Sequence, residues 1–395
     1  MKKILIYTEN YLFGGGNRYL IDTVNALNKE YKVFIFSNKN GLFSSDFENI
    51  KRHYVYKGLN IRTTSYYVNY ARNKSFLIKI IIHGLIKFLN IFLISYFKNR
   101  NIRIFKHELN LIRPDLIFSF NGGFPAAFSC LDLVILSKLL KIPVYLSVVS
   151  VPGNKSIIER IFYSELLNDF SDFIVNCDSI KNNLIDTRSF SKNKIFVLNN
   201  SINESYFKYP KKDTNNKLLK IGYVSRIESS KGIYDLIYSF IELIKTNNQV
   251  ELVVVGKGDS SKLKSICNKH NINNNVSILG FYAGDIMDLI NDFDILVFPS
   301  YWEGLPYTIL EAMTLSKIII STNVGGIPDV IKNNFSGKLI SPNNISGLTD
   351  VLIDVVNNFD VYNYMGENAL EHIKNHHTFD VFTKKLSNLI KIKLN

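Results

Sequence analysis

The chain has 395 residues, of which 46% are hydrophobic and 21% charged, with a formal net charge of +13 at pH 7. This composition excludes a disordered or fibrous protein, and the length suffices for two domains with separate cores. The excess of basic residues favours an anionic partner, either an acidic membrane surface or a nucleic acid. The basic residues look dispersed and no helix-turn-helix, zinc-finger or aromatic RNA-binding pattern occurs, so we expect no nucleic acid partner.

Residues 1–7 resemble the start of a signal peptide, but their apolar part is too short and Glu9 and Asn10 end it, so we predict a buried strand instead. A glycine-rich segment, Phe13 to Tyr19, follows and leads into a periodic helix, Leu20 to Leu27. Glycines between a strand and a helix let a ligand approach the backbone closely. The spacing is not GxGxxG, so the segment is either a phosphate-facing loop or only a tight turn.

A long apolar segment, residues 76–98, follows a strand at Val33 to Ser37 and a stretch, 38–74, without recognisable order. Lysines and a histidine interrupt it at a spacing of four, which predicts a helix with one narrow basic stripe. Such a helix is either buried in the core or lies on a membrane surface. Two lysines fall within any window long enough to cross the bilayer, so we expect no true span.

Strands and helices alternate through the next part of the chain, which predicts a parallel sheet with right-handed crossovers. The expected strands are 116–120, 143–149, 173–176 and 195–198, and the expected helices are 125–140, 157–170 and 179–189. The loops at the carboxyl ends of the strands, which begin at Asn121 and Ser150, should face a ligand cleft.

A second alternating block follows a polar stretch rich in turn residues, 208–217, which predicts an interdomain linker. The expected strands are 219–224, 250–255, 276–279, 295–298 and 318–322. Two cations, Arg226 and Lys231, lie on the loop after the first of these strands. The pair Asp292 and Asp294 has DxD spacing but leads directly into a buried strand, so we interpret it as structural and predict no metal site.

Other candidate metal and redox residues lack the necessary spacing. The adjacent histidines His376 and His377 cannot point to one side of a helix. The three cysteines, Cys130, Cys177 and Cys267, are scattered, as is typical of reduced thiols in a cytoplasmic protein.

The most informative stretch runs from Glu303 to Glu311, between a buried strand and a predicted helix. Gly304 and Pro306 shape the bend, and the first helical residues present backbone N–H groups without intrahelical acceptors. A helix start at the carboxyl end of a parallel strand favours an anion. Two glutamates beside an anion site are consistent with a sugar nucleotide, in which hydroxyl groups lie on both sides of the phosphates.

The stretch Pro299 to Ile331, with Gly325-Gly-Ile-Pro, continues into Gly337 to Pro342. Together these segments resemble the donor-binding half of retaining GT-B glycosyltransferases of the family-four type (glycosyl transferases group 1). The likeness is good over about 195–350 and looser elsewhere. It implies an α/β fold of two Rossmann-like domains facing across a cleft.

The resemblance also assigns roles to individual residues. Arg226, Lys231 and Glu303 become catalytic candidates, with the two cations on the donor phosphates and Glu303 on the sugar hydroxyls. Candidates for donor binding are Gly15, Gly16, Asn200, Gly280, Phe281, Tyr282, Gly304, Leu305, Pro306, Tyr307, Thr308 and Glu311, the last on the ribose.

Two departures from the family pattern concern the acceptor side and the hinge. Many members carry a histidine where this chain has Val149-Ser150, so Asn121 and Ser150 are weak acceptor-side candidates. The segment Val197 to Asn203 matches the family's hinge at Asn200 but lacks its Pro and Gly.

The expected domains are residues 1–207, the acceptor side; 218–375, the nucleotide-sugar side; and a last helix, 376–395, that crosses back to the first. The predicted function is transfer of a hexose-type sugar from a UDP-linked donor to a glycan or lipid-linked acceptor with retention of anomeric configuration, in cell-surface polysaccharide synthesis. We expect no metal or other cofactor. We expect a cytoplasmic location, and residues 76–98 are the candidate for peripheral contact with an acidic membrane. The alternative is a noncatalytic sugar-nucleotide-binding or membrane-surface protein of the same fold, while a dehydrogenase is disfavoured because GxGxxG is absent.

Overall fold

The structure is a computed structural model of the chain that describes residues 1–9, 15–39, 54–71, 75–125, 127–154, 157–163, 172–210 and 218–394. These residues form two compact units. Unit 1 consists of Met1–Asn199 and Phe382–Asn395, and unit 2 consists of Asn200–Val381. The predicted boundary after residue 207 thus falls inside unit 2, and residues 211–217 of the predicted linker lie outside the described residues.

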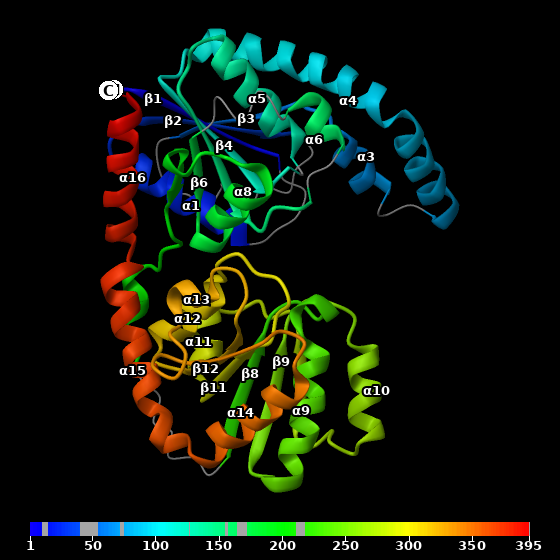
Figure 1. Cartoon of the computed structure of the whole chain (residues 1–395), viewed down its shortest axis with the longest axis vertical. Coiled ribbons are helices and arrows are strands. Elements are labelled where there is room, and N and C mark those ends of the chain that lie inside the picture. The colour runs from blue at the N-terminus through cyan, green and yellow to red at the C-terminus, as the bar shows by residue number, and fades with distance from the viewer. Residues whose placement is uncertain are drawn as a thin grey trace. The chain divides into compact units, whose positions relative to one another are not determined.

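Unit 1 is built on a parallel sheet with the strand order β3-β2-β1-β4-β5-β6-β7. Its strands are β1 (Lys3–Thr8), β2 (Lys32–Asn38), β3 (Tyr54–Leu59), β4 (Leu116–Gly123), β5 (Val144–Ser150), β6 (Asp172–Val175) and β7 (Ile195–Val197). Its helices are α1 (Gly15–Leu27), α3 (Thr64–Ala71), α4 (Phe76–Ile112), α5 (Phe128–Leu139), α6 (Ile157–Phe162), α8 (Asp178–Arg188) and the short η1 (Lys192–Lys194). Helices cover both faces of the sheet (Figure 1).

Unit 2 repeats this architecture with the strand order β10-β9-β8-β11-β12-β13, again all parallel. Its strands are β8 (Leu219–Val224), β9 (Val250–Val255), β10 (Val276–Gly280), β11 (Ile295–Phe298), β12 (Ile318–Thr322) and β13 (Lys338–Ile340). Its helices are η2 (Glu204–Lys208), η3 (Ser229–Lys231), α9 (Ile233–Thr246), α10 (Ser261–Lys269), α11 (Ile286–Asn291), α12 (Tyr307–Thr314), α13 (Ile327–Val330), α14 (Ile345–Asn357) and α15 (Phe359–His376).

Strands β11 and β12 of unit 2 are short runs dominated by apolar residues, ILVF and IIIST. Every residue of β11 and of β12 is buried, as is typical of strands covered on both faces. Alternate residues of these strands, Ile295 and Val297 of β11 and Ile318 and Ile320 of β12, join one core cluster with α9 and α14. The expected α/β fold of two parallel-sheet domains is therefore confirmed.

The last helix, α16 (Phe379–Leu394), begins in unit 2 and continues into unit 1, because the division falls at Phe382. Within unit 1, Phe382 meets the ring of Tyr19 edge to face, with 5.6 Å between ring centroids. The Tyr145 hydroxyl donates to the Leu389 carbonyl at 2.8 Å. The end of the chain is thus part of the packing of the amino-terminal sheet.

Two elements fall in the stretch that showed no recognisable order, namely β3 and α3. Strand β3 is an edge strand with a largely exposed face, so its sequence lacks the apolar run of a buried strand. Helix α4 is also longer than its apolar segment and continues through polar residues to Ile112.

Within the described ranges, no single helix is long and apolar enough to cross a bilayer. The two arms of α4, Leu77–Ile86 and Ile91–Ile112, reach the required length and composition only together, and they are bent by 79°.

Candidate functional site

The predicted site residues of unit 2 gather where its strand order changes direction. From β8 the chain proceeds to β9 and β10 on one side, while β11, β12 and β13 follow on the other. The carboxyl ends of β8 and β11 therefore flank the topological switch point, where open α/β sheets bind their ligands. The loop after β8 carries Arg226 and Lys231, and the loop after β11 carries Glu303.

Lys231 and Glu303 meet directly at this switch point. The Lys231 ammonium lies 2.6 Å from a carboxylate oxygen of Glu303, and the two side chains are 13% and 15% exposed. Lys231 also donates to the Trp302 carbonyl at 3.4 Å. A largely buried ion pair keeps both charges in a low-dielectric environment, where each interacts strongly with a charged ligand.

Arg226 lies on the same loop but is oriented differently. Its guanidinium pairs with Glu228 at 3.0 Å, and its side chain is 64% exposed. The structure therefore brings Lys231 and Glu303 together and leaves Arg226 at the rim of the loop, in contact with a nearby acidic residue.

Close backbone contacts hold the loops after β8, β11 and β12 together. The Tyr301 N–H donates to the Ser230 carbonyl at 2.9 Å, and the Gly326 N–H donates to the Gly304 carbonyl at 2.7 Å. Gly325 has φ +57°, and a Cβ there would lie 1.9 Å from the Glu303 carbonyl oxygen. Glycine is required at this position because any side chain would push the Glu303 loop away.

The helix start predicted next to Glu303 is present as the first turn of α12. Pro306 occupies the N-cap position without a capping hydrogen bond. Tyr307, Thr308 and Ile309 form the first turn, so their N–H groups have no intrahelical acceptor. Gly304, Pro306 and Thr308 are half-buried, whereas Leu305 and Tyr307 are buried.

Two of the predicted donor-binding residues, Asn200 and Glu311, are buried next to this turn. Asn200 is buried and donates its side-chain amide to the Leu305 carbonyl at 2.6 Å, while its own carbonyl oxygen lies 3.0 Å from Nδ1 of His377. Glu311, one turn into α12, is 2% exposed. Glu311 is therefore a buried carboxylate and not a surface helix residue.

The predicted nucleobase segment, Gly280 to Tyr282, follows the end of β10 at the same edge of the sheet. The Phe281 ring is 63% exposed, and the Lys257 ammonium lies 4.2 Å from its centroid. Tyr282 is half-buried. An exposed aromatic ring at a ligand edge can stack on a planar base.

The two aspartates with DxD spacing lie at the opposite end of the sheet. Asp292 pairs with the Lys220 ammonium at 2.8 Å, and Asp294 accepts from the Lys220 N–H at 2.8 Å. They join the amino ends of β8 and β11, which is the structural role that the sequence predicts.

The predicted residues of unit 1 lie near the carboxyl edge of its own sheet. Gly15 and Gly16 form the first turn of α1, and a Cβ on Gly16 would lie 3.4 Å from a methyl group of Val149. Ser150 ends β5 and donates its hydroxyl to the Gly122 carbonyl. Asn121 belongs to β4, which continues to Gly123, so it is part of the strand and not of a loop.

Unit 1 also contains polar residues at its switch point, between β1 and β4, that sequence reasoning missed. Glu9 follows β1 and accepts hydrogen bonds from Thr63, at 2.5 Å, and from Ser129. Ser129 also lies 2.7 Å from the Tyr7 hydroxyl. The only sequence signal was a carboxylate directly after the first strand.

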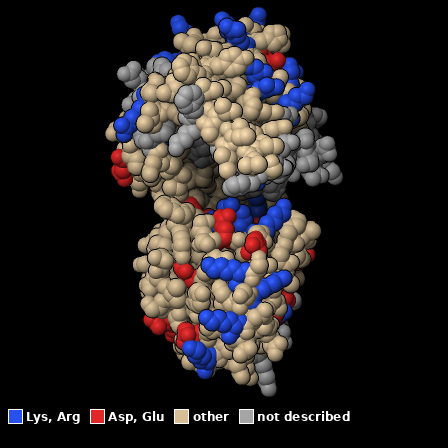
Figure 2. Space-filling model, turned by 90° about the vertical axis from the view of Figure 1, so that its right-hand side faces the viewer, with Lys and Arg blue, Asp and Glu red and all other residues tan. Residues whose placement is uncertain are grey.

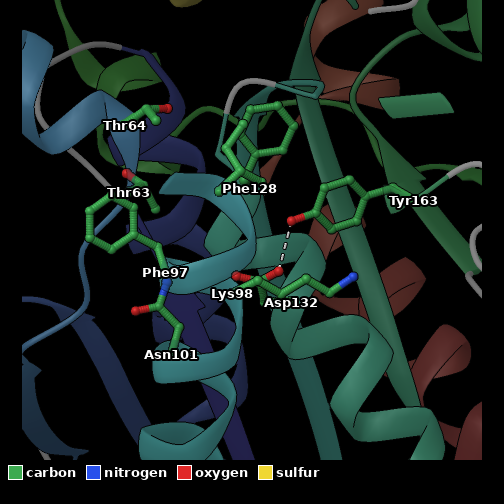
Figure 3. Close-up of a pocket in the computed structure, with 9 residues that line it drawn as sticks. Thr63, Thr64, Phe97, Lys98, Asn101, Phe128, Asp132 and Tyr163 are labelled. Atoms are coloured by element: carbon green, nitrogen blue, oxygen red, sulfur yellow. Dashed lines mark hydrogen bonds between the residues drawn. The ribbon is translucent and has the colours of Figure 1, made fainter. Parts of the chain in front are cut away.

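A small cavity of about 10 Å³, room for roughly one water, lies beside these residues (Figure 3). Asp132 and Lys98 contribute to its wall, and the Tyr163 hydroxyl donates to Asp132 at 2.8 Å. Burial raises the pKa of Asp132 to about 7, against the lowering effect of Tyr163 and Lys98. The Lys98 ammonium lies over the Tyr163 ring, and burial lowers the pKa of Lys98.

Comparison with known proteins gives concordant results for sequence and fold. Residues 204–372 match the family described as "Glycosyl transferases group 1". The chain is 24% identical over 317 residues to the capsular polysaccharide biosynthesis glycosyltransferase CapM of Staphylococcus aureus, covering 73% of this chain and 82% of CapM. It is 28% identical over 203 residues to a poly(ribitol-phosphate) alpha-N-acetylglucosaminyltransferase of the same species, covering 51% of this chain and 40% of that protein.

Among solved structures, Anabaena Alr3699/HepE in complex with UDP superposes with a TM-score of 0.76 at 16% identity, covering 99% of this chain and 100% of that one. The expected GT-B fold is thereby confirmed. Residues 204–372 contain the switch point of unit 2 with Lys231, Glu303 and the start of α12. Residues 204–372 therefore match the glycosyl transferases group 1 family within a chain of GT-B fold, and these findings together support glycosyltransferase activity.

Proposed function

We propose that the chain transfers a hexose-type sugar from a UDP-sugar to a glycan or lipid-linked acceptor, with retention of anomeric configuration, in the synthesis of a cell-surface polysaccharide. The observation that carries the proposal is the Lys231–Glu303 pair beside the first turn of α12. The names of relatives support the finer terms, since CapM is named for capsular polysaccharide and HepE is described with UDP and with UDP-glucose.

The proposed mechanism begins with the charge that develops when the anomeric carbon–oxygen bond breaks. The leaving phosphate becomes more negative, and Lys231 together with the N–H groups of Tyr307 and Thr308 stabilises that charge. Arg226 joins them by exchanging Glu228 for the phosphate, because a guanidinium can bind two phosphate oxygens at once. These donors supply the positive countercharge, so we expect activity without an added divalent metal or other cofactor.

The two glutamates serve the neutral parts of the donor. When phosphate draws Lys231 toward itself, Glu303 is released to accept hydrogen bonds from sugar hydroxyls. Glu311, a buried carboxylate at the second turn of α12, accepts from the ribose hydroxyls. We propose that the leaving phosphate accepts the acceptor's proton, which keeps both partners on one face of the sugar. Consistent with three free, buried cysteines, we place the reaction in the cytoplasm.

A thermal-shift panel of UDP, GDP, ADP, dTDP and NADH tests the donor site. A ligand at about 100 times its dissociation constant adds roughly 2.7 kcal/mol to the free energy of unfolding, which raises the melting temperature by several degrees. We expect UDP to act on the wild type and to lose its effect in Glu311→Ala. Stabilisation by NADH alone, or by none of the five, would refute the proposed donor.

The controls separate folding from binding. Glu371→Ala removes an exposed glutamate of α15 in the same unit and should keep the UDP shift. Glu311→Gln keeps the shape of the buried side chain, so it should fold even if Glu311→Ala does not. UDP binding without UDP release from UDP-sugars in the presence of lipid-linked acceptors would favour the alternative of a noncatalytic binding protein.

A further inference from the structure

The amino-terminal arm of α4 exposes a large apolar surface. Leu77 is 71% exposed and Phe92, just past the bend, is 77% exposed. Between and beside them lie further exposed apolar side chains: Ile78, Ile80, Ile81, Leu85, Leu89, Ile91 and Tyr96. Single exposed apolar residues are ordinary on soluble proteins, but a contiguous group of this size marks a surface that another phase or molecule covers.

The same helix becomes a core helix only farther along. Ile94, Phe97, Phe105 and Leu109 are buried, and the Phe105 ring meets Tyr7 edge to face at 4.9 Å. The sequence left open whether residues 76–98 are core or surface. In the structure, the described side chains of this segment before Ile94 are largely exposed, and the helix joins the core of unit 1 after it.

The bend in α4 places the exposed apolar side chains of its first arm away from the core of unit 1. Leu77, Ile81 and Leu85 are spaced by four and share one face of the first arm. The bend of 79° separates this arm from Ile91–Ile112. In Figure 1 the first arm lies apart from the sheet of unit 1, with α3 as the labelled helix beside it.

The charge of the surrounding segment is strongly positive. The basic residues, which looked dispersed along the chain, are in fact concentrated here: residues 51–113 hold 13 of the 47 Lys and Arg residues but one of the 34 acidic ones. That acidic residue, Glu108, pairs with Lys57 at 2.7 Å. The segment thus carries +12 of the chain's net +13. On this side of unit 1, Figure 2 shows Lys and Arg at the margins of a broad surface whose described residues are mostly uncharged.

We propose that the first arm of α4 and Phe92 lie in the headgroup region of an anionic membrane, with the apolar face toward the acyl chains. Apolar side chains combined with flanking basic residues are the features that bind helices to acidic lipid surfaces. A second copy of the chain fits this face less well, because it would bring two segments of +12 together. A nucleic acid would meet the basic residues but not the exposed isoleucines and leucines.

Co-sedimentation with vesicles tests the proposal. Vesicles of phosphatidylcholine with phosphatidylglycerol should bind the wild type at low salt at least tenfold more tightly than phosphatidylcholine alone, and added salt should weaken that binding. The double variant Ile81→Glu/Phe92→Glu should lose at least tenfold in affinity. The matched control Val361→Glu/Ile392→Glu also places two glutamates at exposed apolar positions, outside α4, and should bind normally.

Several outcomes would overturn it. The wild type could fail to sediment with acidic vesicles at low salt, or both double variants could bind equally well. Light scattering could instead reveal a dimer that Ile81→Glu/Phe92→Glu abolishes, which would assign the face to a second copy. The UDP thermal shift, measured on the same variants, reports on unit 2 and does not depend on the membrane, so the two proposals can fail separately.

Discussion

The switch points of the two sheets occupy equivalent positions but differ in chemistry. In unit 2 a carboxylate, Glu303, pairs with the ammonium of Lys231. In unit 1 a carboxylate, Glu9, accepts from the hydroxyls of Thr63 and Ser129. An ammonium paired with a carboxylate can exchange that carboxylate for a phosphate. A carboxylate that already accepts from hydroxyl groups can instead accept from the hydroxyl groups of a neutral sugar. The comparison shows that the same topology places an ion pair at one switch point and a carboxylate bound by hydroxyl groups at the other.

The largest expected effect is on turnover when the cations of unit 2 are removed. Lys231→Ala should lower kcat/KM by a factor of about 100 to 1,000, equivalent to roughly 3 kcal/mol, as for the loss of one oxyanion donor. Arg226→Ala should cost a comparable factor if its guanidinium moves from Glu228 to the phosphate. Steady-state assays with the UDP-sugar check both, with Lys269→Ala as an exposed lysine control. Near-normal turnover in both variants would refute the proposal that these cations stabilise the leaving phosphate.

The second effect concerns the backbone under Glu303. Gly325→Ala should destabilise unit 2 by roughly 3 kcal/mol or more, because φ is +57° and the new methyl group would overlap the Glu303 carbonyl. Gly280→Ala is the matched control, since φ is +70° but no atom lies within 4 Å of the added Cβ. It should therefore cost only about 1 to 2 kcal/mol. Equal losses in urea unfolding would show that the close approach to Glu303 does not matter.

The third effect is a pH dependence that arises in unit 1. Burial raises the pKa of Asp132 to about 7 in the folded state, while an unfolded Asp titrates near about 3.9. Between these values the folded state holds a proton that the unfolded chain lacks, so this contribution to stability falls as pH rises toward 7. We expect a loss of about 2 kcal/mol between pH 5 and 7. Asp132→Asn should flatten the curve, and an unchanged slope of the free energy of unfolding against pH would contradict the assignment.

The smallest effect is expected at the nucleobase side of unit 2. Phe281→Ala should weaken UDP binding by about 1 kcal/mol, or roughly fivefold, through the loss of ring stacking. Calorimetric titration measures the change directly. Phe335→Ala, which removes another ring that is about half exposed, should leave UDP binding unchanged.

Much of unit 2 could be predicted because its site depends on where strands end. A buried run such as Ile295–Phe298 predicts a parallel strand, and the residues after its carboxyl end must face the ligand edge. The contact of Lys231 with Glu303 follows from two neighbouring strands of this kind. The orientation of Arg226 could not be predicted in this way, because its guanidinium pairs with Glu228, only two residues away.

Unit 1 was harder to predict because its polar contacts join distant parts of the chain. Glu9 and Ser129 are 120 residues apart, and no short motif relates them. Asp132 lies within a strongly apolar helix, where a single carboxylate has no recognisable sequence pattern. Strand β3 was missed because an edge strand with an exposed face lacks apolar periodicity.

Helix α16 has a consequence for the order in which the protein can be made. The Tyr145 hydroxyl and the Tyr19 ring of unit 1 contact residues that the ribosome adds only after unit 2 has been synthesised. During translation, the part of unit 1 that packs against α16 therefore stays uncovered until unit 2 has been synthesised. The first unit to be synthesised is the last to be completed.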